Sequence, residues 1–326
     1  MTLAAAVDLG SNTLRLLIAE VEEGDSPTLT PVLLERRITR LSQHLVPGRP
    51  LFGPARERTM AALAELGRLV KAHGVKKVFG GATAAVRLAG DGDDFLDQAA
   101  SVTGLRLRKI DGLEEARLTA LGLLAGLETG AQAWLAPWLA IDPGGRSTEL
   151  IPLEEGRPRP GLSLEMGVVE LTERFLHQAP ALAREVAALT EEVRRKLGEA
   201  ISFYPPRSGL RLAGTAGTVT TIAAMLLEME PYDPRAITGR VITLAEMDRL
   251  QARIEALDLD RRRRLPGLEA GREDVILAGL VVVRELLRVY GLSEMTVVDS
   301  GLLEGHIIDG LGLTRARGNG CIHGPE

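Results

Sequence analysis

The feature that most constrains the fold is a pattern that occurs twice along the chain. Residues 4–21 read AAAVDLGSNTLRLLIAEV, an apolar run that ends at Asp8, then a glycine turn and a second apolar run. Residues 139–153 read LAIDPGGRSTELIPL and repeat this order, with Asp142 in the place of Asp8. Two apolar runs around a glycine turn predict a β-hairpin. The copies lie much further apart than the roughly 20–50 residues of a solenoid repeat, so they predict two related domains.

The segments around these hairpins alternate between helix-like and strand-like patterns, which predicts an α/β fold. The patterns favour helices over 60–70, 114–127 and 181–203, and strands over 75–83, 105–110 and 295–301. We place one domain at 1–128, together with a returning segment at about 302–326, and the other at 129–301. The linker is expected near Glu128 to Ala131, where a glycine interrupts the helical pattern.

Charge and composition limit the possible partners. The net charge of -5 argues against broad nucleic-acid binding, which usually requires a basic excess. No apolar run approaches the roughly 18 residues of a membrane span, and the N-terminus lacks the features of a signal peptide. A single cysteine, Cys321, supplies no disulfide framework, so we expect a soluble cytoplasmic protein with no nucleic-acid or membrane partner. The run from Arg261 to Arg264 is interpreted as a solvated helix end.

Three glycine-rich turns are candidates for binding phosphate. Consecutive backbone N–H groups in such a turn form a concave anion site, and a following helix adds its N-terminal dipole. One turn is weak evidence because hairpins need glycine anyway, but three turns, two of them a repeat, favour an anion site. The candidate residues are Gly10, Ser11, Asn12, Thr13 and Arg15; Gly144, Gly145, Arg146 and Ser147; and Gly214, Thr215, Gly217 and Thr218.

Seven segments carry a resemblance to a known family. They are DLGSNTLRLLI (8–18), GATAAVRLA (81–89), DGLEEARL (111–118), DPGGRSTEL (142–150), GTAGTVTTIA (214–223), GREDVILAG (271–279) and DSGLLEG (299–305). In this order along nearly the whole chain, they resemble the exopolyphosphatase and guanosine pentaphosphate phosphohydrolase family, in its short form without a C-terminal His-Asp domain. The resemblance implies a duplicated, ribonuclease H-like actin-like ATPase fold with the active site in the interdomain cleft. It also implies hydrolysis of a terminal phosphate.

Glu115 is the candidate for activating water, because it matches the family's catalytic glutamate before the alanine of the EEA motif. The local sequence supports this separately, since Asp111 and Glu114 have capping-box spacing and leave Glu115 free. A carboxylate in a first helical turn is expected to stay ionised, as a group that orients or deprotonates water should be. Arg87 matches the family's phosphate-binding arginine, and a planar guanidinium suits phosphate.

Three acids match metal-proximal positions of the family. They are Asp142 and Glu149 on the second hairpin and Asp8 on the first. Hard oxygen ligands beside a phosphate substrate indicate Mg²⁺ or another divalent cation, usually held by one or two carboxylates with water and phosphate oxygens. Without a cation, these acids would repel the substrate.

The chain departs from the family pattern at two positions. Arg146 stands where a third glycine is usual, and Leu303 replaces an arginine. The Arg146 side chain is expected either to disturb the turn or to offer another cation to a long substrate. The resemblance leaves polyphosphate and guanosine penta- or tetraphosphate open as ligands, and homodimers are common in the family. Two alternatives remain open: a kinase or ATPase of the same fold, and a nucleotide-binding regulator with little turnover.

Overall fold

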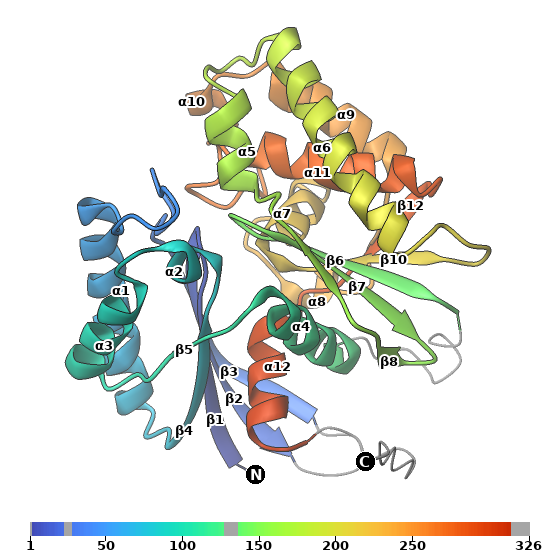
Figure 1. The fold of residues 1–326 in the computed structure, drawn as a ribbon. Helices are drawn as coiled ribbons and strands as arrows, with labels where there is room; N and C mark the ends of the chain where they lie inside the picture. The colour runs from blue at the N-terminus through green and yellow to red at the C-terminus, as the bar shows by residue number, and fades with distance from the viewer. Residues whose placement is uncertain (1, 23–27, 127–135, 314–326) are drawn as a thin grey trace, which may run out of the picture.

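The computed structural model describes residues 2–22, 28–126 and 136–313, which form two β-sheets flanked by helices (Figure 1). The linker predicted at Glu128 to Ala131 and the single cysteine lie outside the described residues. Within the described part, no helix is long and apolar enough to cross a membrane.

The first sheet has the strand order β3-β2-β1-β4-β5. Its strands are β1 (Thr2–Leu9), β2 (Thr13–Glu22), β3 (Thr28–Ile38), β4 (Lys77–Ala82) and β5 (Arg108–Lys109). β1 pairs antiparallel with β2 and parallel with β4. The strand predicted over 105–110 is shorter than expected, because only its last part pairs with β4 at the sheet edge.

Both faces of the first sheet are covered. Alternate residues of β1, such as Val7, pack with α1 (Gly53–Ala72) and α3 (Gly92–Thr103). The residues between them, such as Ala6, pack with Leu303 and Ile307 of α12 (Leu302–Gly310). A strand buried on both faces must be apolar throughout, which explains the unbroken apolar run before Asp8.

The second sheet has the order β11-β12-β10-β6-β7-β8, with β9 also paired to β7. Its strands are β6 (Trp138–Pro143), β7 (Thr148–Glu154), β8 (Arg157–Pro158), β9 (Leu162–Leu164), β10 (Arg211–Gly214), β11 (Val241–Thr243) and β12 (Glu294–Val297). β6 pairs antiparallel with β7 and parallel with β10, as β1 does with β2 and β4. This repeated arrangement confirms the predicted duplicated α/β fold.

Seven further helices are present in the described residues, and most of them share a hydrophobic core with the second sheet. They are α5 (Val168–Phe175), α6 (Ala183–Phe203), α7 (Ala216–Leu226), α8 (Pro234–Ile237), α9 (Leu244–Glu255), α10 (Leu259–Arg262) and α11 (Ile276–Val289). The Arg261 to Arg264 run does end α10, but its interpretation as a solvated face is wrong for Arg262. That guanidinium is buried and donates to the carbonyls of Ile254 and Glu273 at 3.0 and 3.3 Å.

Two helices lie between the sheets. α4 (Gly112–Gly126) packs through Ala116 and Ala120 on the second sheet, whereas α12 packs on the first. They cross so closely that a Cβ at Gly122 would meet the carbonyl of Gly301. α12 therefore returns to the first sheet as expected, while the exact domain limits stay a prediction.

Candidate active site

The two hairpins are built in the same way. In their strand registers Asp8 faces Arg15, and Asp142 faces Glu149, so the shared spacing of charged residues is a cross-strand pairing. Each turn is closed by one hydrogen bond between equivalent groups: the first glycine N–H donates to the carbonyl three residues later, at 3.1 Å in the first turn and 2.9 Å in the second. The two turns are copies of one structural unit.

The two turns meet at the cleft. A Cβ placed on Gly145 would lie 3.0 Å from the Cβ of Ser11 and 3.2 Å from the backbone nitrogen of Asn12, so the turns are in van der Waals contact. A cavity of about 70 Å³ lies between them. Thirteen of the predicted site residues line it: Asp8, Gly10, Ser11, Asn12, Thr13, Arg15, Glu115, Asp142, Gly144, Gly145, Ser147, Gly217 and Thr218.

Several predicted phosphate contacts are placed differently. The N–H groups of Gly10 and Gly144 close their own turns and are not available to an anion. The N–H groups of Ser11 and Gly145 have no backbone acceptor among the described residues, so these remain candidates for phosphate. Thr218 lines the cavity, although its hydroxyl donates to the carbonyl of Pro143 at 3.0 Å.

Gly214 and Thr215 do not line the cavity. Gly214 ends β10, and a Cβ there would meet the side chain of Met295. The Thr215 hydroxyl donates to the carbonyl of Ser300 at 2.8 Å. The structure therefore places both residues between the turn and the sheet behind it, and their role as phosphate contacts stays a prediction.

The Arg146 side chain also points away from the predicted ligand. Its Nη2 donates to the carbonyls of Ser42 and Leu45, both at 2.9 Å, and the residue is only 9% exposed. The expectation that Arg146 disturbs the turn or offers a cation to the substrate is therefore wrong for the side chain. Leu303, the second departure, is buried in the apolar contact between α12 and the first sheet.

Glu115 and Arg87 form an ion pair beside the turns. Arg87, on α2 (Ala84–Leu88), places its Nη1 3.2 Å from Glu115 Oε2 and 2.7 Å from the carbonyl of Ile110. Arg87 does not line the cavity itself, so it reaches the site through Glu115. Burial, followed by the charges of Glu149, Asp142 and Asp8, raises the pKa of Glu115 well above its usual range. This direction is opposite to the one expected from the helix dipole, because burial and the three acids favour the neutral form of the carboxyl group.

The neighbouring Glu114 is part of the helix start, as predicted, but only half of the capping box forms. The Asp111 carboxylate accepts the N–H of Glu114 at 2.8 Å. The Glu114 carboxylate, instead of reaching back, binds Arg108 and Arg117, each at 2.7 Å. Adjacent glutamates thus have separate roles, one at the surface and one in the cleft.

The three predicted metal-proximal acids are close to one another but are not equivalent. Asp8 Oδ2 accepts from Arg15 at 2.7 Å. Burial raises the pKa of Asp142 to about 6, with a further contribution from Asp8 and an opposing one from Arg15. Burial and the charge of Asp142 raise the pKa of Glu149 to about 8.

The predicted set of three acids is not assembled as a metal cluster. No group of three His, Cys, Asp or Glu side chains within the described ranges is arranged to hold a metal ion. Glu149 Oε1 accepts from the Ser163 hydroxyl at 2.7 Å, which fixes the carboxylate on β9, and Glu149 does not line the cavity. Of the three acids predicted to lie near a metal, only Asp8 and Asp142 line the cavity.

Two residues with polar side chains that line the cavity were not predicted. Arg272 faces the first turn, with its Nη2 3.4 Å from the Thr13 hydroxyl, and its guanidinium lies against Gly217, where a Cβ would meet it. Thr83 lines the cavity at the end of β4. Both residues lie in segments that resemble the family, 81–89 and 271–279. That resemblance was the sequence signal by which they could have been predicted as site residues.

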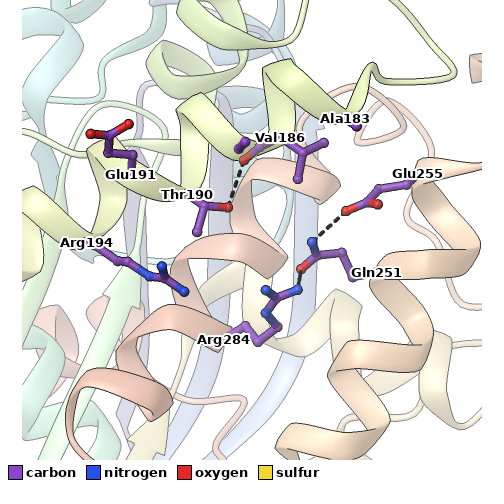
Figure 2. Close-up of a pocket in the computed structure, with 9 residues that line it drawn as sticks. Ala183, Val186, Thr190, Glu191, Arg194, Gln251, Glu255 and Arg284 are labelled. Carbon is purple, nitrogen blue, oxygen red and sulfur yellow. Dashed lines mark hydrogen bonds between the residues drawn. The ribbon is translucent and has the colours of Figure 1, made fainter.

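A larger cavity of about 580 Å³ lies between α6, α9 and α11 (Figure 2). None of the predicted site residues lines it. Its central Gln251 accepts from Arg284 and donates to Glu255, so these polar groups are bound to one another. We therefore assign the chemistry to the smaller cavity between the turns.

The first sheet, β3-β2-β1-β4-β5, has the same order as the strands β8-β7-β6-β10-β12 of the second. Two such sheets, each presenting an Asp-Gly hairpin to a shared cleft, define an actin-like two-domain protein. Comparison with known proteins agrees with this class. A crystal structure of the Aquifex aeolicus Ppx/GppA family member superposes with a TM-score of 0.78 at 29% identity, covering 95% of this chain and 97% of that one. The fold of an exopolyphosphatase from Cytophaga hutchinsonii is also similar, with a TM-score of 0.83 at 23% identity over 95% and 98% of the two chains.

The chain belongs to the Ppx/GppA phosphatase family, whose model matches residues 17–313. Exopolyphosphatase 2 of Mycobacterium tuberculosis is 35% identical over 317 residues, which cover 94% of this chain and 97% of that protein. The protein is therefore a phosphohydrolase that acts on phosphoric anhydride bonds.

Proposed function

We propose that this phosphohydrolase releases the terminal phosphate of inorganic polyphosphate, of guanosine pentaphosphate, or of both, by attack of water that Glu115 orients. The observation that carries the proposal is the position of the Glu115 carboxylate. It lines the cavity between the two glycine-rich hairpin turns and is held by Arg87. The 35% identical exopolyphosphatase supports polyphosphate as one substrate.

The turns supply the electrostatic part of the reaction. Phosphoryl transfer depends mainly on positioning and on donors for the charge of the equatorial oxygens. The N–H groups of Ser11 and Gly145, the Arg272 guanidinium and the amide of Asn12 are suited to this role. The Asn12 Nδ2 is buried and has no partner among the described residues, so it is a donor with capacity for a phosphate oxygen.

Glu115 would accept a proton from the attacking water or orient it. Its raised pKa makes it a stronger base once ionised, which favours this role. Arg87 would keep the carboxylate in place while it also stabilises the ionised form.

The acids of the cleft fit a divalent cation such as Mg²⁺. Asp8 Oδ1 is buried and makes no hydrogen bond to another described residue. Burial raises the pKa of Asp142 although Arg15 opposes the shift, so a cation beside this carboxylate would favour its ionised form. Asp8 and Asp142 would hold the cation, with Glu149 behind them, and this number of carboxylates is usual for Mg²⁺. When bound, the cation would neutralise these acids and polarise phosphate oxygens.

Neither departure from the family pattern favours a non-hydrolytic regulator. Arg146 binds backbone carbonyls, and Leu303 fills an apolar contact, so neither removes a donor from the cavity. A homodimer stays a prediction.

The proposal is tested by measuring phosphate release with Mg²⁺ from polyphosphate, guanosine pentaphosphate and ATP side by side. We expect release from at least one of the first two and slower release from ATP. Release from ATP alone would favour the ATPase or kinase alternative. Tight nucleotide binding with no release at any Mg²⁺ concentration would favour the regulator.

Replacing Glu115 with glutamine tests the role of its carboxylate. We expect Glu115→Gln to lower kcat by about 10²- to 10⁴-fold, the usual contribution of a general base, while the protein remains folded. The matched control is Glu114→Gln, because this neighbour binds surface arginines and should leave kcat within about twofold. Near-normal release by Glu115→Gln would remove this residue from the mechanism.

A further inference from the structure

Residues 39–45, which follow β3, contact the first turn directly. We call them the bridging segment. The N–H of Thr39 donates to the carbonyl of Asn12 at 3.0 Å, and the N–H of Ser42 donates to that of Ser11 at 2.9 Å. The bridging segment is therefore attached to the backbone of the first turn.

The second turn holds the same segment through Arg146. Its guanidinium donates to the carbonyls of Ser42 and Leu45, so the backbone of a single residue, Ser42, connects Arg146 to the first turn. The carboxylate of Glu173, on α5, accepts the N–H of His44 at 3.4 Å and lies 3.9 Å from Arg146. A guanidinium bound to two carbonyls in a buried place forms stronger hydrogen bonds than neutral donors do.

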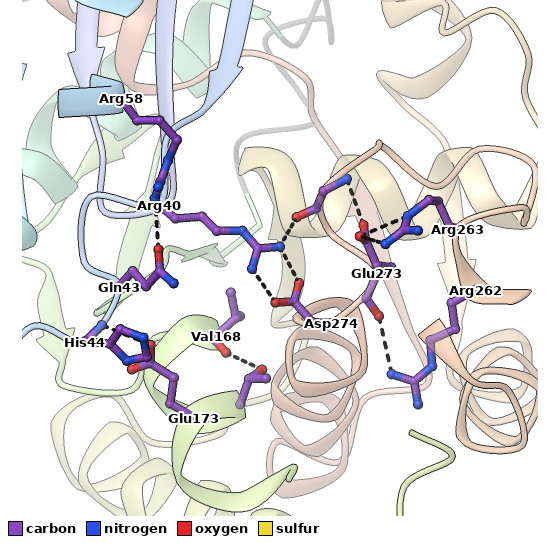
Figure 3. A network of polar contacts seen from close by, with 12 residues as sticks. Arg40, Gln43, His44, Arg58, Val168, Glu173, Arg262, Arg263, Glu273 and Asp274 are labelled. Atoms are coloured by element: carbon purple, nitrogen blue, oxygen red, sulfur yellow. Dashed lines mark hydrogen bonds and ion pairs between the residues drawn. The ribbon is translucent and has the colours of Figure 1, made fainter. Parts of the chain in front are cut away.

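A third connection holds the loop that carries Arg272. Arg40 donates to both oxygens of Asp274, at 2.7 and 3.0 Å, and to the carbonyl of Gly271 at 3.0 Å (Figure 3). These two partners lie on either side of Arg272 in the chain, so Arg40 fixes the loop that presents this guanidinium to the cavity.

The bridging segment is also braced from its own domain. Arg58 of α1 donates to the side chain of Gln43 at 2.9 Å (Figure 3). It also donates to the carbonyl of Thr39 at 3.0 Å. The segment thus has fixed contacts on both sides of the cleft.

We propose that the bridging segment sets the separation of the two turns and the Arg272 loop, and that Arg146 is the positioning residue that attaches it to the second turn. The small cavity of about 70 Å³ is the result, since it is enclosed by the elements that the segment connects. Arg146 acts through the backbone of Ser42 and has no contact with the substrate. The inference rests on the proposed function, because the group to be enclosed is a terminal phosphate.

A positioning role and a substrate-binding role for Arg146 predict different behaviour. If the Arg146 cation binds the substrate, its contribution to binding should be larger for longer phosphate chains, and salt should weaken that contribution. If Arg146 instead fixes the spacing of the turns, its contribution to binding should be the same for every chain length, because the same terminal phosphate occupies the cavity.

The structural part is tested by amide hydrogen exchange in the substrate-free protein. We expect Arg146→Met and Arg146→Gly each to increase exchange in residues 39–45 by on the order of tenfold, the effect of losing one charged hydrogen bond. Asp274→Asn, which weakens the Arg40 connection, should increase it as well. The control is Arg159→Met, an exposed arginine that binds Glu154 away from the cleft. Unchanged exchange in the Arg146 variants would overturn the proposal, and this measurement does not depend on the reaction.

The functional part is tested by comparing tripolyphosphate with long-chain polyphosphate. We expect Arg146→Met to raise KM on the order of tenfold, by the same factor for both substrates and at both low and high salt. An increase in KM that is larger for long-chain polyphosphate and smaller at high salt would show that Arg146 binds the substrate. If the unmodified protein releases no phosphate, the proposed function fails, while the exchange result still decides whether the segment connects the turns.

Discussion

At the scale of single residues, the environment of Glu115 determines its chemistry. The sequence predicted its neighbour Asp111 as a helix cap, and the hydrogen bond to the N–H of Glu114 confirms this. The raised pKa of Glu115 could not be predicted in the same way. It depends first on burial and then on Glu149, Asp142 and Asp8, which come from the two hairpins and approach Glu115 only in the folded chain.

This environment predicts how activity depends on pH. Glu115 must be ionised to accept a proton, and its raised pKa means that the ionised fraction increases only as the pH rises. We expect kcat/KM to rise with pH and to reach a plateau above the range of an ordinary glutamate. The measurement is phosphate release at limiting substrate between about pH 5 and 9.

The variant Glu149→Gln tests whether the neighbouring acids cause the raised pKa of Glu115. The charge of Glu149 is the largest contribution from another residue to the raised pKa of Glu115, so removing it should move the rising limb to lower pH. Glu114→Gln should leave the limb where it is. A limb that stays fixed in Glu149→Gln would show that another group controls the profile.

At the scale of elements, the two hairpins were predicted because each has a local pattern of apolar runs and glycine. The roles of individual turn residues were predicted less well. Thr215 and Gly214 belong to a glycine-rich turn in the sequence, but their surroundings come from a distant part of the chain. Met295 of β12 lies against Gly214, and Ser300, which follows β12, accepts from Thr215. Local sequence identifies a turn, whereas the packing behind it decides which of its residues face the cavity.

The contact between the hairpins makes Gly145 sensitive to substitution. In Gly145→Ala the new Cβ would lie 3.0 Å from the Cβ of Ser11 and 3.2 Å from the nitrogen of Asn12, a backbone atom that cannot rotate away. The two turns must separate by a few tenths of an ångström, and misplacement of phosphate donors is costly for catalysis. We expect kcat/KM to fall by about 10-fold or more.

Gly198→Ala is the matched control in a helix of the same domain. Gly198 lies in α6 with nothing within 4 Å of the added Cβ, so alanine should stabilise the protein by about 0.5–1 kcal/mol and leave activity unchanged. Thermal unfolding and phosphate release on both variants provide the comparison. Equal activity in the two variants would show that the turns tolerate separation.

At the scale of the whole molecule, the sequence repeat was enough to predict two related domains, because each copy of the hairpin begins a sheet in which five strands have the same order. The connections across the cleft were not predictable. Arg40 and Asp274 are separated by 234 positions, and nothing local to either residue indicates the other. Arg146 was singled out as a departure from the family pattern, yet its partners are backbone carbonyls, which leave no signature in a sequence.

The acids gathered in the cleft predict how the stability of the whole molecule depends on pH and on a cation. In the folded protein the pKa of Glu149 is raised to about 8 and that of Asp142 to about 6, whereas the unfolded chain has ordinary values. As the pH rises above those ordinary values, the unfolded state loses its protons first, so the folded state binds more protons. Stability therefore falls as the pH rises from about 5 to 8 in the absence of a cation.

A divalent cation should oppose this loss, because it binds the ionised acids of the folded state and has little affinity for the unfolded chain. We expect Tm to fall between about pH 5 and 8 with a chelator present, and to fall less with Mg²⁺. Glu149→Gln should flatten the curve measured with a chelator, since it removes the carboxyl group whose pKa is raised to about 8 in the folded protein. Thermal unfolding across this range, with both variants and both conditions, gives the measurement. A chelator curve that rises with pH would show that these carboxylates are already compensated within the protein, and the case for a cation at Asp8 and Asp142 would be lost.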